Sequence, residues 1–259
     1  MQNSVRSEKS RGIVAFATNT TTTDYVSIAR RTLKLASHVL KLPHTLITDV
    51  SQQTWTNHRY DIDQGQFVEW KNVGRHMAYE LSPYDETLVI DADYLVLDDS
   101  LLKIFQVDWD YILQRHSHTF EQDFPSSMGP HSLPFVWATV FAFRKTPRAQ
   151  QFFDLVDRVQ LNYSYYRELF NLEQRNYRND CAFAIADIVL NGYTVGTDTI
   201  PGSMLTVDQL VDSIEIKDNN LIVRDHTRAY VIPWTNLHVM SKRYLQSDNF
   251  AEFVDHATA

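Results

Sequence analysis

The sequence predicts an α/β fold, in which a mostly parallel, Rossmann-like central sheet is flanked by helices and followed by a small C-terminal extension of strands and loops. Short apolar runs alternate with helical patterns through most of the chain. The length of 259 residues and the hydrophobic content of 44% are enough to bury the core of one large domain. We expect that domain over residues 12–245, with a flexible tail at 1–11 and a C-terminal tail at 246–259.

The first elements form a β-α-β unit. Residues 12–18 (GIVAFAT) are an apolar run that predicts a strand, and a threonine-rich turn follows it. Residues 24–42 place apolar side chains at helical spacing behind Asp24 as the N-cap, and residues 44–49 (HTLITD) predict the second strand. A unit of this kind implies parallel strands joined by a right-handed crossover.

The middle of the chain continues the alternation. Residues 51–70 show no clean period and are interpreted as a loop or an irregular segment. Residues 73–84 predict a helix that ends before Pro83, and residues 87–97 (TLVIDADYLVL) predict a strand. The further expected elements are a short helix at 101–105, strands at 110–114 and 135–145, helices at 147–166 and 178–192, and short strands at 194–200, 221–227 and 230–234.

Charge and composition limit the function. The net charge of -8 disfavours non-specific binding of nucleic acid over the whole surface, although a cluster of basic residues between Arg144 and Arg178 is either a local basic patch or an ordinary solvated helix face. No apolar run approaches the roughly 20 residues of a membrane helix, and the polar start lacks the apolar middle of a secretory signal. With the single cysteine Cys181, these features predict a cytoplasmic protein.

Two carboxylates follow an apolar strand. Asp91 and Asp93 lie at positions i and i+2, so their side chains point the same way at the carboxyl end of the strand, where ligands collect in open α/β sheets. Hard carboxylate oxygens suit Mg²⁺ or Mn²⁺. The alternative is that these acids cap a loop or pair with surface lysines. Burial of an unpaired carboxylate costs several kcal/mol, which favours a cation or strong donors at this point.

The stretch GRHMAYELSPYDETLVIDAD resembles the GT-A nucleotide-sugar glycosyltransferases, and within them the glycogenin and galactinol synthase group. It contains, in that group's order, Arg75, Pro83, Tyr84, Asp91 and Asp93. The similarity covers about residues 12–242 and is strongest over 71–99. It implies a GT-A fold and the transfer of a sugar from a nucleotide diphosphate donor.

The resemblance also implies roles for individual residues. Asp93, Asp91 and a histidine near the C-terminal end, His238, would hold Mn²⁺ or Mg²⁺ on the donor diphosphate. Arg75 would lie against the diphosphate or the donor sugar, unless it is an ordinary surface arginine of a helix. The candidates for base and ribose contacts, which have a plain turn role as their alternative, are Thr18, Asn19, Tyr25 and Asp49.

The C-terminal motif departs from the family pattern. The family has glycine three residues after the histidine and a diphosphate-binding lysine six residues after it, where this chain has Ser241 and Tyr244. Lys242 or Arg243 is the expected substitute for that lysine.

The acceptor side has diverged as well. The strand that the family turns toward the acceptor starts here with Trp-Ala-Thr at 137–139 in place of Asn-Ala-Gly. Asp180 matches an acid near the donor sugar, and an acid stabilised by a helix N-terminus is the alternative for it.

The two acids and this resemblance together predict a metal-dependent glycosyltransferase. The resemblance implies a UDP-sugar donor and retention of the anomeric configuration; if the enzyme inverts, Asp180 is the first candidate for the base. The acceptor is a glycan, a protein side chain or a hydroxymethylated pyrimidine in phage DNA, since small chains of this kind also resemble proteins of tailed phages. One alternative is a nucleotide-sugar binding module without turnover. Another is a glycoside hydrolase, although two acids separated by one alanine are poorly placed to flank a scissile bond.

Overall fold

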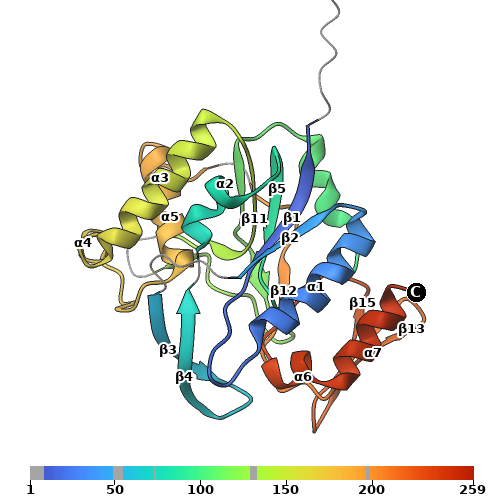
Figure 1. The fold of residues 1–259 in the computed structure, drawn as a ribbon. Helices are drawn as coiled ribbons and strands as arrows, with labels where there is room; N and C mark the ends of the chain where they lie inside the picture. The colour runs from blue at the N-terminus through green and yellow to red at the C-terminus, as the bar shows by residue number, and fades with distance from the viewer. Residues whose placement is uncertain (1–8, 49–54, 73, 129–132, 197–198) are drawn as a thin grey trace, which may run out of the picture.

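The computed structural model describes residues 9–48, 55–72, 74–128, 133–196 and 199–259. It is an α/β structure whose central five-stranded sheet has the order β2-β1-β5-β11-β7 (Figure 1). The strands of this sheet are β1 (Arg11–Phe16), β2 (His44–Ile47), β5 (Glu86–Ile90), β7 (Tyr111–Gln114) and β11 (Trp137–Arg144). β1 is parallel to β2 and β5, whereas β11 is antiparallel to both of its neighbours. The expected mostly parallel sheet is confirmed, and β11 is the strand that runs against the others.

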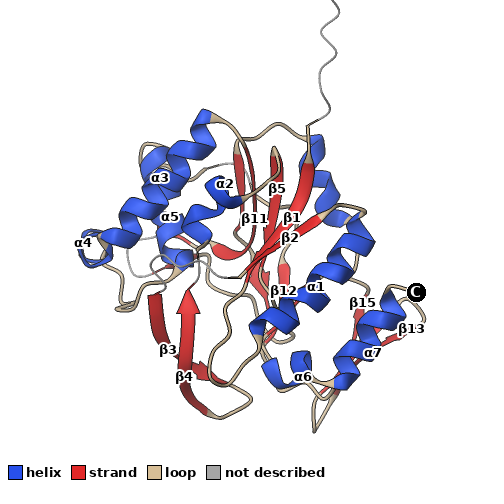
Figure 2. Ribbon diagram, in the orientation of Figure 1, coloured by secondary structure: helices blue, strands red, loops and turns tan. Residues whose placement is uncertain are grey.

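Helices cover both faces of this sheet (Figure 2). Side chains alternate along a strand, so neighbouring residues of β1 enter different cores. Val14 packs in the core that contains α3 (Pro147–Leu161) and α5 (Asn179–Leu190). Ile13 packs in the core that contains α1 (Tyr25–Leu40). The sheet is therefore buried on both faces, and its carboxyl edge is where polar side chains can gather.

A second, four-stranded sheet lies against that edge. Its order is β6-β16-β12-β8, and its strands are β6 (Tyr94–Leu95), β8 (Ser117–His118), β12 (Met204–Val207) and β16 (Leu237–Val239). β6 starts directly after Asp93 and pairs with β16, so His238 lies opposite Tyr94. This pairing brings the C-terminal part of the chain to the two acids that follow β5.

Residues 51–70 are not the irregular segment that the sequence analysis expects. Their described part belongs to a two-stranded antiparallel hairpin of β3 (Trp55–Asp61) and β4 (Gln66–Asn72). The Asp61 side chain accepts hydrogen bonds from the backbone N–H groups of Asp63 and Gln64 at 2.9 and 3.0 Å. Gly65 follows with φ of 64°, a conformation that glycine adopts without strain. The prediction was wrong because both strands are rich in polar side chains, which hides the apolar alternation of an ordinary strand.

The C-terminal segment also differs from the expected tail. Residues Lys242–Gln246 form α6, and Asp248–Ala257 form α7 with the Ser247 side chain as its cap. α7 packs against α1 and β13 (Ser213–Lys217). Its apolar residues recur at helical spacing and form one face that packs on the core. Phe250 on this face is fully buried.

The remaining elements agree only in part with those expected from the sequence. The helix expected at 73–84 is a 3-10 turn, η1 (Arg75–Met77), followed by the short α2 (Ala78–Leu81). The strand expected at 194–200 is absent from its described residues, where Thr199 makes a single bridge to Leu113. The others are η2 (Ser100–Gln106), α4 (Tyr163–Leu169), β9 (Ser127–Met128), β10 (Leu133–Pro134), β14 (Asn220–Arg224) and β15 (Ala229–Pro233). None of the helices in the described ranges combines the length and the apolar composition that crossing a bilayer requires.

Candidate functional site

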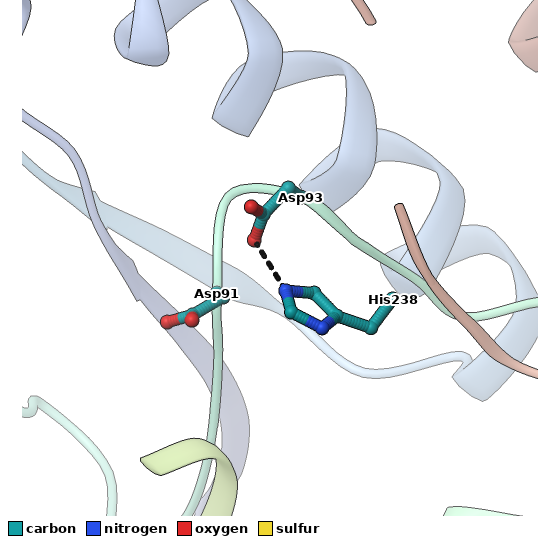
Figure 3. A group of neighbouring side chains, drawn as sticks. All are labelled: Asp91, Asp93 and His238. Carbon is teal, nitrogen blue, oxygen red and sulfur yellow. Dashed lines mark ion pairs between the residues drawn. The ribbon is translucent and has the colours of Figure 1, made fainter. Parts of the chain in front are cut away.

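The two acids after β5 lie in a tight turn at the carboxyl edge of the central sheet. The backbone N–H of Asp91 donates to the carbonyl of Thr139 on β11 at 2.8 Å, and its carbonyl accepts from the N–H of Tyr94 at 3.1 Å. The turn directs the Asp93 side chain toward His238 on β16 (Figure 3). Asp93 and His238 are both buried, at 7% and 6% exposure.

Asp91, Asp93 and His238 form a possible metal site. One ligand atom from each lies within 4.8 Å of the other two, and the Asp93 carboxylate is 3.6 Å from His238 Nε2. Carboxylate oxygens suit Mn²⁺ and Mg²⁺, and the imidazole nitrogen favours Mn²⁺ of these two. The donor set therefore fits the cation that the sequence analysis expects.

Basic side chains neutralise both acids. Arg75 donates to the Asp91 carboxylate from η1. The Lys242 ammonium contacts Asp93 at 2.5 Å and also donates to the carbonyls of Met240 and Val239 at 3.0 and 3.4 Å. These three acceptors use the three N–H bonds of Lys242. The ammonium is thus bound as a counter-ion of Asp93 and has no donor left for a ligand.

Electrostatics keep Asp93 ionised. Burial by itself would raise the pKa of Asp93, but the charges of Lys242 and His238 and the hydrogen bonds from both hold this pKa well below its ordinary value. Burial lowers the pKa of Arg75, and the nearby Asp180 and Asp93 carboxylates oppose that shift. Burial also raises the pKa of Tyr25, so its phenol stays protonated at neutral pH.

A cavity of about 230 Å³ adjoins the acids and gathers most of the predicted site residues. The predicted residues that line it are Thr18, Tyr25, Arg75, Asp91, Asp93, Asp180 and His238. Asn19 is not among its lining residues and instead accepts a hydrogen bond from the N–H of Val26 at 2.9 Å, at the start of α1. Lys242 lines a smaller cavity beside it, and Asp49 lies outside the described residues.

Asp180 lies at the start of α5, between two cavities. Its carboxylate accepts from the backbone N–H of Ala138 at 2.9 Å and from Arg178 at 2.5 Å. Asp180 and Arg178 line both the 230 Å³ cavity and a second one of about 240 Å³. This second cavity has apolar walls that include Phe135 and Leu172. The two cavities therefore adjoin at the Asp180 carboxylate.

The basic cluster between Arg144 and Arg178 does not form one surface. Arg144 is buried, and its guanidinium binds Glu86 at 3.0 Å and Asp108 at 2.7 Å. Arg178 is bound to Asp180 beside the cavity. Arg144 is therefore not part of a solvated basic patch, and the charge of Arg178 is paired with Asp180.

Among the lining residues that the sequence did not predict, three belong to the hairpin. Arg59 comes from β3, and Trp70 and Lys71 come from β4. The turn at Asp61 to Gly65 was the available signal, since two polar strands around such a turn are typical of a hairpin.

The structure also explains the two residues that depart from the C-terminal family motif. The Ser241 hydroxyl donates to Asp63 at 2.7 Å, and Tyr244 is buried in the core.

Comparisons with known proteins find similarity in structure only. No family model matches the sequence, and no curated protein matches it. The glycosyltransferase GlyE of Streptococcus pneumoniae TIGR4, in its apo form, is 14% identical with a TM-score of 0.38, over 72% of this chain and 44% of that one. The chain therefore spans less than half the length of GlyE.

Two further structures are similar over more of this chain. The catalytic domain of Drosophila β1,4-galactosyltransferase 7, in complex with xylobiose, is 10% identical with a TM-score of 0.43, over 95% of this chain and 79% of that one. A glycosyltransferase involved in the glycosylation of the major capsid of PBCV-1 is 10% identical with a TM-score of 0.39, over 95% of this chain and 98% of that one.

Proposed function

We propose that this chain is a metal-dependent glycosyltransferase of the GT-A type, which moves a sugar from a nucleoside diphosphate donor, with uridine as the base, to a hydroxyl acceptor. The observation that carries the proposal is the convergence of Asp91, Asp93 and His238 within 4.8 Å at the wall of a 230 Å³ cavity. Buried carboxylates at the carboxyl edge of an α/β sheet are typical of a cation and phosphate site.

Each residue of the site has a task in this reaction. Asp91, Asp93 and His238 would hold Mn²⁺ or Mg²⁺, which supplies positive charge against the negative charge that develops on the departing nucleoside diphosphate. Thr18 and Tyr25 line the same cavity from the end of β1 and the start of α1, where they can contact the base and ribose. Arg75 keeps the Asp91 carboxylate oriented and presents the rest of its guanidinium to the donor.

The acceptor enters through the second cavity, and its hydroxyl meets the donor at Asp180. The partly apolar walls of this cavity suit the face of a sugar ring, so we take a glycan as the acceptor. Asp180 is held by Ala138 and Arg178, which fixes its carboxylate between the two cavities. The reaction is retaining, as in the group that the sequence resembles, and Asp180 positions the acceptor or the donor sugar.

Asp180→Asn is expected to lower kcat by about a hundredfold, because the acceptor hydroxyl loses a charged partner. The asparagine oxygen can still accept from Ala138, so the fold is preserved. Donor affinity, measured by titration calorimetry in the presence of Mn²⁺, should stay at the parent value. A kcat unchanged by the substitution would remove Asp180 from the reaction.

Thermal unfolding with a panel of nucleotide sugars tests the donor. A UDP-sugar at about a hundred times its Kd is expected to raise Tm by on the order of 5 °C. The shift should require Mn²⁺ or Mg²⁺ and disappear with a chelator. A donor that binds without turnover, with glycan acceptors and metal present, would indicate a binding module, and chelator-insensitive cleavage of an aryl glycoside would indicate a hydrolase. No shift with any nucleotide sugar would contradict the proposal.

A further inference from the structure

The β3–β4 hairpin turns one face toward the candidate site. Arg59 on β3 lies opposite Val68 on β4, and Trp70 is on the same face as Val68 because side chains alternate along a strand. These residues line the cavities beside Asp93, whereas Phe67 on the other face is 71% exposed. In Figure 1 the hairpin stands apart from the central sheet. β3 and β4, which the sequence did not predict, thus form one wall of the candidate site.

Hydrogen bonds attach the tip of the hairpin to the strand that carries His238. Asp63 in the turn accepts from the Ser241 hydroxyl at 2.7 Å and from the backbone N–H of Arg243 at 2.6 Å. Ser241 lies directly after Met240, which follows β16. The tip of the hairpin is therefore held against the segment that follows β16, although Asp63 and Arg243 are 180 residues apart along the chain.

The ion pairs in the 230 Å³ cavity leave one of its cations without an acid among the described residues. Every acid that lines this cavity has a basic partner, in the pairs Asp91–Arg75, Asp93–Lys242 and Asp180–Arg178. The Lys71 ammonium, which also lines the cavity, lies 3.8 Å from Glu69. The Arg59 guanidinium has no acidic partner within the described ranges and lies over the Trp70 ring, 5.4 Å from its centroid. The cavity thus has an excess of positive charge at Arg59.

We propose that Arg59 is the anion-binding residue of this site and holds the diphosphate of the donor. This inference rests on the proposed function. A guanidinium offers a planar set of donors that matches two phosphate oxygens at once, and stacking on an indole orients it without using those donors. Lys242, one of the two residues that the sequence offers for the diphosphate, has all three N–H bonds engaged. The Asp63 contacts then set the distance between Arg59 and the acids.

Calorimetric titration with inorganic pyrophosphate, UDP and uridine, each in the presence of Mn²⁺, tests the inference. Arg59→Gln is expected to weaken pyrophosphate and UDP binding by about tenfold or more and to leave uridine binding unchanged, because only the first two ligands carry phosphate. Arg30→Gln is the matched control: it removes the same charge from an exposed position of α1 and should change none of the three affinities. Arg59→Lys keeps the charge and should lose less affinity than Arg59→Gln.

A second variant tests the contact at the tip. Asp63→Ala removes the acceptor for Ser241 and Arg243 and should weaken pyrophosphate binding, but less than Arg59→Gln does. Equal UDP and pyrophosphate binding by the parent and Arg59→Gln would overturn the role of Arg59 and leave the glycosyltransferase proposal standing. Arg59-dependent binding of pyrophosphate without binding of any nucleotide would support the anion site and refute the nucleotide donor. A parent protein that binds none of the ligands would refute both.

Discussion

Asp93→Ala is expected to abolish metal-dependent transfer, with a loss in kcat/KM of at least about a hundredfold to a thousandfold. The substitution removes the buried carboxylate that lies between His238 and Lys242, and with it one of the three grouped ligand atoms. The measurement is donor hydrolysis or transfer at saturating Mn²⁺. Activity that stays within about tenfold of the parent would refute the role of Asp93 in catalysis.

The same substitution has a cost in stability. Lys242 is 5% exposed and its ammonium loses the carboxylate at 2.5 Å, and a buried charge left without its partner costs about 3–5 kcal/mol. The double variant Asp93→Ala/Lys242→Met removes both charges, so it should recover most of the free energy of unfolding and remain inactive. This control separates lost chemistry from lost folding. Recovery of activity in the double variant would show that the unpaired lysine, and not the missing ligand, caused the defect.

Phe250→Ala is expected to lower the free energy of unfolding by about 3–5 kcal/mol, because it removes a fully buried ring. Phe250 on α7 contacts the rings of Tyr244 and Phe253, with centroids 5.6 and 6.3 Å apart. Urea unfolding followed by circular dichroism measures the change. Glu252→Ala, on the exposed side of the same helix, is the control and should shift stability by less than about 0.5 kcal/mol. If the two variants proved equally stable, the packing of α7 would not contribute to the stability of the fold.

The helix α7 was not predicted from the sequence. Phe250, Phe253 and Val254 are spaced for one helical face, but ten residues among many polar ones form a weak pattern. The helix is stabilised by packing on α1 and β13, which are distant in sequence. Local propensity did not predict it because most helical stability comes from such tertiary contacts.

Some residues of the candidate site could be predicted from local sequence, and others could not. The strand that leads to Asp91 was predicted, because the consecutive apolar residues Leu88, Val89 and Ile90 make a strong local signal. The single strand expected at 87–97 is wrong in its extent: β5 ends at Ile90, and β6 begins only at Tyr94, after the turn that carries both acids. His238 joins them through the pairing of β6 with β16, which no local pattern specifies. The resemblance to a family supplied that residue before the structure placed it, and its role as a ligand stays a prediction.

The sequence by itself determined the alternation of strands and helices, the mostly parallel sheet and the two acids at its edge, since each depends on residues close together in the chain. Only the tertiary structure decided which charge meets which. It binds Lys242 to Asp93, buries Arg144 against Glu86, and places Arg59 over the Trp70 ring with no ion pair to an acid among the described residues. The physical reason is that Coulomb energy depends on distance and burial, and both are set by chain segments that meet only after folding.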